Sequence, residues 1–214
     1  MLIGEYKPEH FHGLPTLETA REKFKALNGD ALVKDVFRPF FLQHGMDERF
    51  GLAILHRHFD LTIEERLVDY NGTSSPWPTA PTKGIEEPHP SIWAKAPDGY
   101  FRPTEYRYSR DDGGEIGEAE LSFMDKFDQL LQRHDASGVF GLCCYPGNDF
   151  EGSCEITVGR ANINLKPADY PNDLQQVDTA WFFSVPLWTR GCRCTCNASA
   201  ADHPHGTHVY TISG

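Results

Sequence analysis

The chain has 214 residues, of which 39% are hydrophobic and 12% aromatic, a composition typical of a soluble globular protein with one well-filled core. Its 31 acidic and 20 basic residues give a formal net charge of -11 at pH 7. This charge repels phosphates and anionic lipids, and no cluster of Lys and Arg offsets it. We therefore exclude nucleic-acid binding and attachment to acidic membrane surfaces.

Residues 1–15 are predicted to form an irregular arm, because they carry prolines and histidines without periodicity. They lack the basic region, apolar run and cleavage site of a secretory signal. No stretch of the sequence approaches the roughly 20 apolar residues of a membrane span. We therefore expect a cytoplasmic protein with a single domain, 1–214, whose six cysteines are thiols or metal ligands rather than disulfides.

Helix signals come first along the chain. Thr16 is a good N-cap, apolar residues follow at helical spacing, and Asn28-Gly29 supplies a left-handed stop. A second helix follows, which Pro39 is expected to kink or end. From Arg49 the periodicity changes to two, which predicts a central strand. One face of this strand carries Phe50, Leu52, Ile54, His56 and His58.

Five prolines mark residues 71–90 as a loop, which in a compact domain is typical of a lid or binding loop. The longest helix is expected from about Glu118 to Arg133, where the apolar stripe is wide. Alternating residues predict strands at 65–70, 91–95, 104–109, 139–145, 154–165, 179–185 and 207–212. The pattern predicts an α+β fold, a mostly antiparallel sheet with two or three helices.

Part of the sequence recurs at an offset of 90 residues. Segments 37–52 and 127–142 share the five identical residues listed here in pairs: Phe37 and Phe127, His44 and His134, Phe50 and Phe140, Gly51 and Gly141, Leu52 and Leu142. Both read as a helix, a polar turn and an apolar strand. Either an ancient duplication about a pseudo-twofold axis or the general likeness of helix-to-strand junctions explains this.

The densest group of metal-binding residue types lies in segment 190–208. Alternate cysteines on an extended chain point their sulfurs to one side, and the histidines that follow can complete a tetrahedral shell around a transition metal ion, with zinc the favoured ion. The spacing differs from that of known zinc knuckles, so reduced thiols beside a polar loop, or redox chemistry, are alternatives. The predicted ligands are Cys192, Cys194, Cys196, His203, His205 and His208.

A second candidate site lies on the predicted central strand. His56 and His58, two residues apart, can share a metal ion or divide the acid and base roles of a reaction. If segments 37–52 and 127–142 are equivalent, Cys144 corresponds to Ile54 and brings a thiol near both imidazoles. The competing interpretation is that the histidines leave the core and bond to loop carbonyls.

Three functional hypotheses follow. The favoured one is a small, metal-dependent enzyme in which His56, His58 and Cys144 are catalytic residues and act on a small organic substrate. The second is a non-catalytic interaction or structural protein whose segment 190–208 is stabilised by zinc. The third is a thiol redox or metal-buffering protein. The sequence shows no phosphate loop, dinucleotide fingerprint, nucleophile elbow or zincin motif, and it specifies neither substrate nor oligomeric state.

Overall fold

Ten strands form the body of the protein and close into a barrel. The structure is a computed structural model that describes residues 3–109, 114–171, 174–185, 187–188 and 190–196. The strands are β1 Phe50–Ile54, β2 Glu65–Tyr70, β3 Thr73–Pro78, β4 His89–Lys95, β5 Phe101–Arg107, β6 Phe140–Cys144, β7 Ser153–Val158, β8 Ala161–Leu165, β9 Gln175–Trp181 and β10 Cys192–Cys196.

The barrel follows the order β1-β6-β4-β5-β2-β3-β8-β7-β10-β9, and β9 pairs back onto β1. Its sheet is mixed, because β2 pairs with β5 and β7 with β10 in parallel, whereas the other neighbours run antiparallel. The predicted α+β fold, a mostly antiparallel sheet with two or three helices, is therefore wrong. Alternation along each strand predicts faces but not closure, which depends on pairings between strands far apart in sequence.

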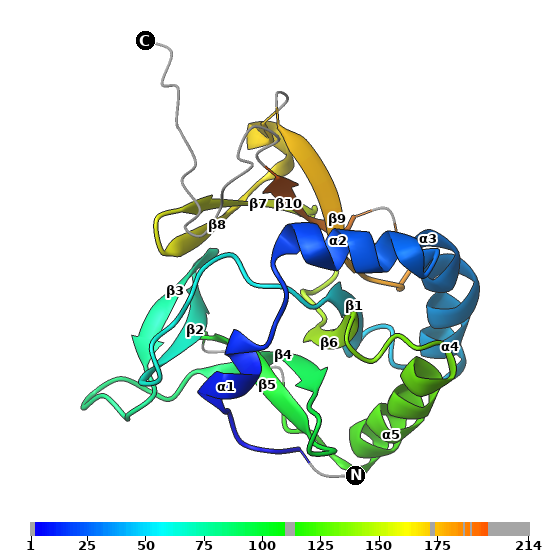
Figure 1. The fold of residues 1–214 in the computed structure, drawn as a ribbon, viewed down its shortest axis with the longest axis horizontal. Helices are drawn as coiled ribbons and strands as arrows, with labels where there is room; N and C mark the ends of the chain where they lie inside the picture. The colour runs from blue at the N-terminus through cyan, green and yellow to red at the C-terminus, as the bar shows by residue number, and fades with distance from the viewer. Residues whose placement is uncertain (1–2, 110–113, 172–173, 186, 189, 197–214) are drawn as a thin grey trace.

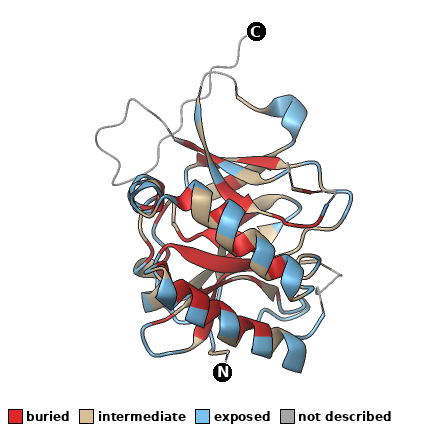
Figure 2. Ribbon diagram, turned by 90° about the vertical axis from the view of Figure 1, so that its right-hand side faces the viewer, coloured by how far each residue is buried: buried red, intermediate tan, exposed pale blue. Residues whose placement is uncertain are grey.

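Helices cover one side of the barrel as an arc, and their solvent-facing sides are exposed while their inner sides are buried (Figures 1 and 2). Thr16 caps the second helix through the backbone N–H of Thr19, and Asn28 adopts the predicted left-handed conformation. The helical elements are α1 Pro8–His12, α2 Leu17–Ala26, α3 Gly29–Ala31, the π-helix η1 Leu32–Phe37, α4 Arg38–Gln43, α5 Glu118–Arg133 and the 3₁₀-helix η2 Pro167–Asp169.

Pro39 does not end the helical path. It occupies the first turn of α4, the helical position where proline is best tolerated. The preceding turns form η1, and the N–H of Arg38 reaches back five residues to the carbonyl of Val33. The wider π turns therefore carry the chain past the proline without a break.

The main core lies between this arc of helices and the pair β1 and β6. Phenylalanine dominates it: Phe37, Phe127 and Phe140 are each fully buried, and the Phe37 and Phe140 rings lie 4.9 Å apart between centroids. Because β1 and β6 present alternate residues to this core and to the barrel interior, both of their faces are buried. The core thus holds these two strands rigidly beneath the cavity described below.

Segments 37–52 and 127–142 follow the same local course. In each, a helix ends at a histidine, one residue with positive φ follows, and a short turn leads into a strand. The positive-φ residues are Gly45 (φ 62) and Asp135 (φ 53), at equivalent positions of the two segments. The strands that follow, β1 and β6, are antiparallel neighbours with Leu52 opposite Leu142.

Two further predictions about segments differ from the structure. Residues 71–90, predicted as a loop, include β3 and the start of β4, because Asn71-Gly72 forms a tight turn with positive φ at both residues and returns the chain beside β2. Residues 1–15, predicted as an irregular arm, include α1. No helix among the described residues combines the length and the apolar character needed to cross a bilayer.

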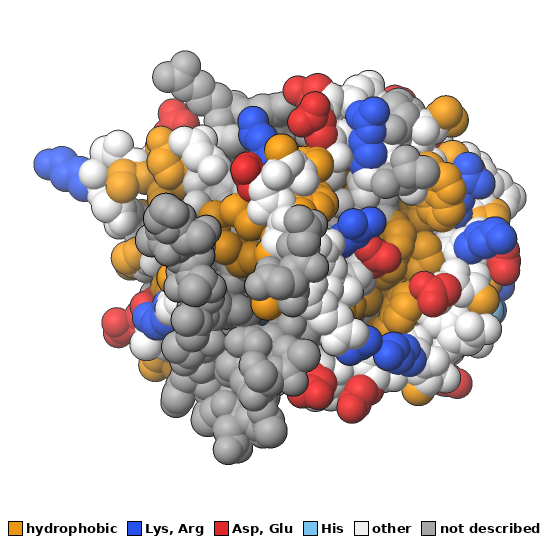
Figure 3. All heavy atoms as spheres, turned by 90° about the horizontal axis from the view of Figure 1, so that it is seen from above, with side chains coloured by type: hydrophobic (Ala, Val, Ile, Leu, Met, Phe, Trp, Pro, Cys, Tyr) orange, Lys and Arg blue, Asp and Glu red, His pale blue; other side chains and the backbone are white. Residues whose placement is uncertain are grey.

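Charged side chains of both signs are interspersed with hydrophobic patches on the face seen from above (Figure 3). Ion pairs of the protein include Arg193 with Asp178 at 2.9 Å and Arg66 with Glu87 at 2.6 Å. Pairs of this kind contribute roughly 0–1 kcal/mol each to stability. The barrel is therefore held together by its ladders and core rather than by surface charge.

Candidate metal centre

The interior of the barrel contains a cavity of about 400 Å³, to which every one of the ten strands contributes at least one lining residue. Its wall is mixed, with apolar residues such as Leu14, Leu55 and Phe182 beside polar ones. Charged and sulfur-containing side chains contribute to the lining on β2, β5, β6, β7 and β10. Those used below are His56, Asp69, Glu105, Arg107, Glu155, Cys143, Cys192 and Cys194.

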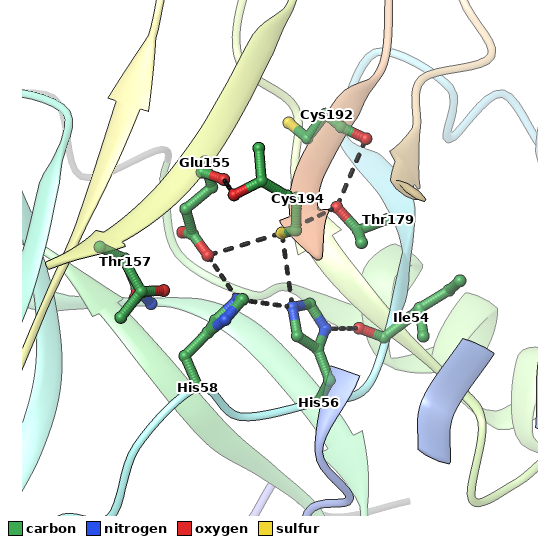
Figure 4. A network of polar contacts seen from close by, with 10 residues as sticks. Ile54, His56, His58, Glu155, Thr157, Thr179, Cys192 and Cys194 are labelled. Carbon is green, nitrogen blue, oxygen red and sulfur yellow. Dashed lines mark hydrogen bonds and ion pairs between the residues drawn. The ribbon is translucent and has the colours of Figure 1, made fainter. Parts of the chain in front are cut away.

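Four side chains converge beside this cavity, and three of them, His56, Glu155 and Cys194, line it (Figure 4). The donor atoms of His56, His58, Glu155 and Cys194 all lie within 4.8 Å of one another, and this group could hold a metal ion. The Nε2 atoms of the two histidines are 3.1 Å apart, and Nε2 of His58 is 2.7 Å from Oε1 of Glu155. The Cys194 sulfur is 3.5 Å from both His56 Nε2 and Glu155 Oε1.

The two separations from the Cys194 sulfur, 3.5 Å each, match those of a tetrahedral zinc shell, whereas the two contacts of His58 Nε2, at 3.1 and 2.7 Å, are shorter. With Zn–N near 2.1 Å and Zn–S near 2.3 Å, neighbouring donors in such a shell lie roughly 3.3–3.8 Å apart. Four groups that each present a lone pair to one point repel one another unless protons or a cation lie between them. Small movements of the four side chains toward or away from a common centre would therefore place their donor atoms around a divalent ion.

His56 is already oriented as a ligand. Its Nδ1–H donates to the carbonyl oxygen of Ile54 at 2.8 Å, which leaves the lone pair of Nε2 directed at the other three groups. Burial, reinforced by the nearby His58, lowers the pKa of His56 to about 4. The imidazole is therefore neutral near pH 7, as a metal ligand must be.

The two acidic groups respond differently to their surroundings. Burial alone would raise the pKa of Glu155, but the charge and hydrogen bond of His58 outweigh it, so the pKa is lowered and the carboxyl is ionised. Burial raises the pKa of the Cys194 thiol well above its usual value, and Glu155 adds to this effect. Without a cation Cys194 is a neutral thiol, and a bound divalent ion would supply the charge that converts it to a thiolate.

The histidines do not project from the face of a strand, as the sequence predicted. Strand β1 ends at Ile54, so His56 and His58 lie on the chain that leaves the strand rather than on its face. Both nevertheless point toward Glu155 on β7 and Cys194 on β10. The strand shortens because Arg57 bonds to the segment before α2, its N–H to Pro15 and its side chain to Leu14, which draws the chain out of the sheet.

Of the predicted cysteine ligands, the structure brings Cys194 to the histidines. Cys192 also borders the cavity but lies outside the four-residue group, and its pKa is raised to about 11, chiefly by burial. The side chain of Cys196 and the residues His203, His205 and His208 lie outside the part of the chain that the structure describes. The structure therefore joins both histidines of one predicted site and one cysteine of the other into a mixed group.

Cys144, predicted to lie near the histidines, is placed at the other end of β1. Because β1 and β6 are antiparallel, Cys144 pairs with Phe50, and it is Phe140 that pairs with Ile54. Its sulfur contacts the carbonyl oxygen of Pro90 at 3.7 Å. Cys143, which alternates with it, is the thiol that packs on Ala53 and the inner wall. A catalytic role for Cys144 stays a prediction.

Glu155 was not predicted from the sequence. The alternation of Cys154, Ile156 and Val158 defines the apolar face of β7, so Glu155 falls on the opposite face, which would normally be solvent. In a closed barrel that second face points into the cavity. A lone acidic residue within an otherwise uncharged strand is the signal that could have identified it.

Glu105 on β5 is a second carboxyl in the same cavity. Burial raises its pKa to about 8, with Glu155 and Asp69 adding to the effect and Arg107 opposing it. Glu105 and Glu155 thus differ in protonation near pH 7 although they share one cavity. Two carboxyls whose pKa values are driven apart are a common feature of catalytic sites.

The raised pKa of Glu105 predicts how the free energy of unfolding depends on pH. Below the usual pKa of a glutamate both folded and unfolded chains hold the proton, whereas between that value and about 8 only the folded chain does, so stability falls as pH rises. We expect Glu105→Gln to raise the free energy of unfolding by about 2 kcal/mol near pH 7 and to change it little near pH 4. Urea unfolding at both pH values measures this, and an equal change at both would contradict it.

Comparisons with known proteins gave no match, so the functional assignment rests on the geometry of the site. No protein-family model, curated protein or solved structure matches the chain.

Proposed function

We propose that the protein is a metal-dependent enzyme that acts on a small organic substrate in the barrel cavity. The observation that carries this proposal is the convergence of His56, His58, Glu155 and Cys194, because three of them, His56, Glu155 and Cys194, line a cavity of about 400 Å³. Two imidazoles, a carboxylate and a thiolate form a donor set that suits a transition metal ion, zinc above all. The ion would polarise an oxygen of the substrate or of a bound water molecule.

The position of the group favours catalysis over a purely structural site. Structural zinc sites are closed by four protein ligands, whereas catalytic sites keep a position for water or substrate. Here three of the donors border a cavity large enough for a small molecule, and Cys194, the donor that depends most on the cation for deprotonation, can leave a position to the substrate. Glu155 and the histidines would then remain as the three protein ligands.

A structural metal site is the second candidate. It is favoured by the origin of the ligands, because an ion bound by all four would cross-link the chain after β1 to both β7 and β10. A thiol redox role has less support: burial raises the pKa of Cys143, Cys192 and Cys194, so these thiols are poorly nucleophilic near pH 7.

Metal content tests the first part of the proposal. We expect the untagged protein to hold about one zinc or similar ion, and each of His58→Ala, Glu155→Gln and Cys194→Ser to weaken binding by at least about 100-fold, since even outer-shell substitutions weaken metal sites 10- to 100-fold. Elemental analysis and competition with a chromophoric chelator measure this. Cys192→Ser, on the same strand and cavity wall, is the matched control and should keep the ion.

A metal-free wild-type protein would overturn the proposal. If Cys192→Ser loses the ion as fully as Cys194→Ser, the ligands lie in segment 190–208 and the site in the cavity is wrong.

The Co²⁺-substituted protein separates an enzyme site from a structural one. Acetohydroxamate, a small chelating ligand, should change the visible spectrum of the cobalt ion if a coordination position is open to the cavity. An unchanged spectrum, together with a large loss of thermal stability on metal removal, would establish the structural alternative instead.

A further inference from the structure

The cavity wall opposite the metal group carries a carboxyl that the proposed metal site does not use. Glu105 lies on β5 and lines the cavity, and in register it faces Leu67 of β2 on one side and Ile92 of β4 on the other. Neither neighbour offers a hydrogen-bonding side chain. The Glu105 side chain makes no hydrogen bond or ion pair with any of the residues that the structure describes.

Without a bound ion, the charged groups around Glu105 favour its neutral form. Asp69 on β2 and Glu155 on β7 are both acidic, and Arg107 on its own strand is engaged with Asp69 at 4.0 Å. Strand β4 presents only the uncharged Ser91 and Ile92 to the cavity. The titratable residues of α1, which packs on the other side of β5, are directed elsewhere; His12, for example, contacts the carbonyl oxygen of Leu61.

Asp69 is the other cavity carboxyl that could hold a proton toward the ligand, but it already has interaction partners. Burial raises the pKa of Asp69, but the Arg107 guanidinium at 4.0 Å and a hydrogen bond from the backbone of Gly72 oppose this shift and favour the ionised form. Asp69 and Arg107 therefore form a charge pair, in which Asp69 holds a cation. Glu105, without such a partner, is the group free to hold a proton toward the cavity.

We propose that Glu105 is the proton-donating carboxyl of the cavity, and that the ligand it meets carries an oxygen anion, such as a carboxylate, coordinated to the ion at His56, His58, Glu155 and Cys194. This inference rests on the proposed function. The Glu105 hydroxyl donates a hydrogen bond to the anionic oxygen. When the proton is transferred, the O–H bond of Glu105 breaks, its electron pair stays on the carboxylate, and the proton bonds to the ligand oxygen.

Charge bookkeeping in the cavity supports an anionic ligand. A divalent ion balances Glu155 and a Cys194 thiolate, Arg107 balances Asp69, and neutral Glu105 adds no charge. If Cys194 remains a thiol and leaves the ion, the set carries one net positive charge. A monoanionic oxygen ligand then completes both the coordination shell and the charge balance.

Acetate binding to the Co²⁺-substituted protein tests the inference, with the visible spectrum of the ion as the readout. In the wild type, acetate affinity should be steady at neutral pH. Once the pH exceeds the pKa of Glu105, affinity should fall by about tenfold per pH unit, because an ionised Glu105 repels the anion and cannot donate. Glu105→Gln keeps an N–H donor at every pH, so this fall should disappear while cobalt content stays the same.

Asp69→Asn is the matched control. It removes a cavity carboxylate that raises the pKa of Glu105, so the fall in acetate affinity should move to lower pH but remain. Competition by hydroxide for the ion would affect wild type and Glu105→Gln alike and therefore cannot mimic the expected difference.

Each result has one meaning. Identical pH profiles in the wild type and Glu105→Gln, or no acetate binding to a protein that does hold cobalt, would overturn the role of Glu105 and leave the metal site intact. Failure of the wild type to bind cobalt would overturn the proposed function itself. Loss of cobalt from Glu105→Gln would show that Glu105 supports the metal site instead of serving a ligand.

Discussion

Phe140→Ala is expected to lower the free energy of unfolding by about 4 kcal/mol, the largest effect we predict for a single substitution. Phe140 is fully buried at the start of β6. Its ring lies 4.9 Å from that of Phe37, 5.8 Å from that of Phe24 and 6.5 Å from that of Trp181, measured between centroids. The substitution would leave a cavity between the helices, β1 and β9, which close-packed neighbours cannot fill.

Chemical denaturation monitored by circular dichroism measures this effect. Phe140→Leu, which keeps most of the apolar volume, should cost well under half as much. Leu42→Ala, at a position that is 38% exposed, should cost less than about 1 kcal/mol. A loss below about 2 kcal/mol for Phe140→Ala would show that this core is not close-packed as described.

Gly141→Ala is expected to cost about 3 kcal/mol, at the upper end for an overpacked core. A Cβ at Gly141 would lie 2.4 Å from the backbone oxygen of Trp93 and 2.6 Å from Cδ2 of Leu55. The Trp93 oxygen belongs to the neighbouring strand β4, so it cannot move without disturbing the ladder. The glycine is thus required by the close approach of two strands.

Gly138 provides a matched control three residues earlier. A Cβ there would meet nothing within 4 Å, so Gly138→Ala should be neutral or stabilise slightly by restricting the unfolded chain. Equal destabilisation by the two substitutions, measured by thermal and urea unfolding, would contradict the close packing of β6 against β4.

Much of the local structure follows from local sequence signals. Helix α5 runs from Glu118 to Arg133 as its apolar stripe predicts, and β2 ends at the Asn71-Gly72 turn that its residue types specify. These features depend on residues within a few positions of one another, so periodicity and turn chemistry are enough to predict them.

Closure of the barrel could not be predicted in the same way. It depends on the parallel pairings of β2 with β5 and of β7 with β10, whose partners are separated by about 40 residues in each case. In an open α+β sheet the polar faces of β5 and β7 would normally face solvent. In the barrel those faces enclose the cavity, so Glu105 and Glu155 were overlooked as site residues.

The candidate site was predicted in part. The spacing of His56 and His58 indicated that their imidazoles could act together, and the cysteine-rich segment 190–208 contains Cys194. The histidines and Cys194 belong to one site because β10 joins the barrel between β7 and β9. No local pattern contains that information, because it is set by the fit of a short strand between two others.

The position of β10 also sets the order in which the ion site can be completed during synthesis. His56 and Cys194 are 138 residues apart, and Glu155 precedes Cys194 on a strand that pairs beside it. A ribosome would therefore release both histidines long before the thiol, and the nascent chain would expose an incomplete set of the proposed donors throughout that interval. If the group holds an ion as proposed, its uptake would be a late event of biosynthesis, tied to the insertion of one five-residue strand.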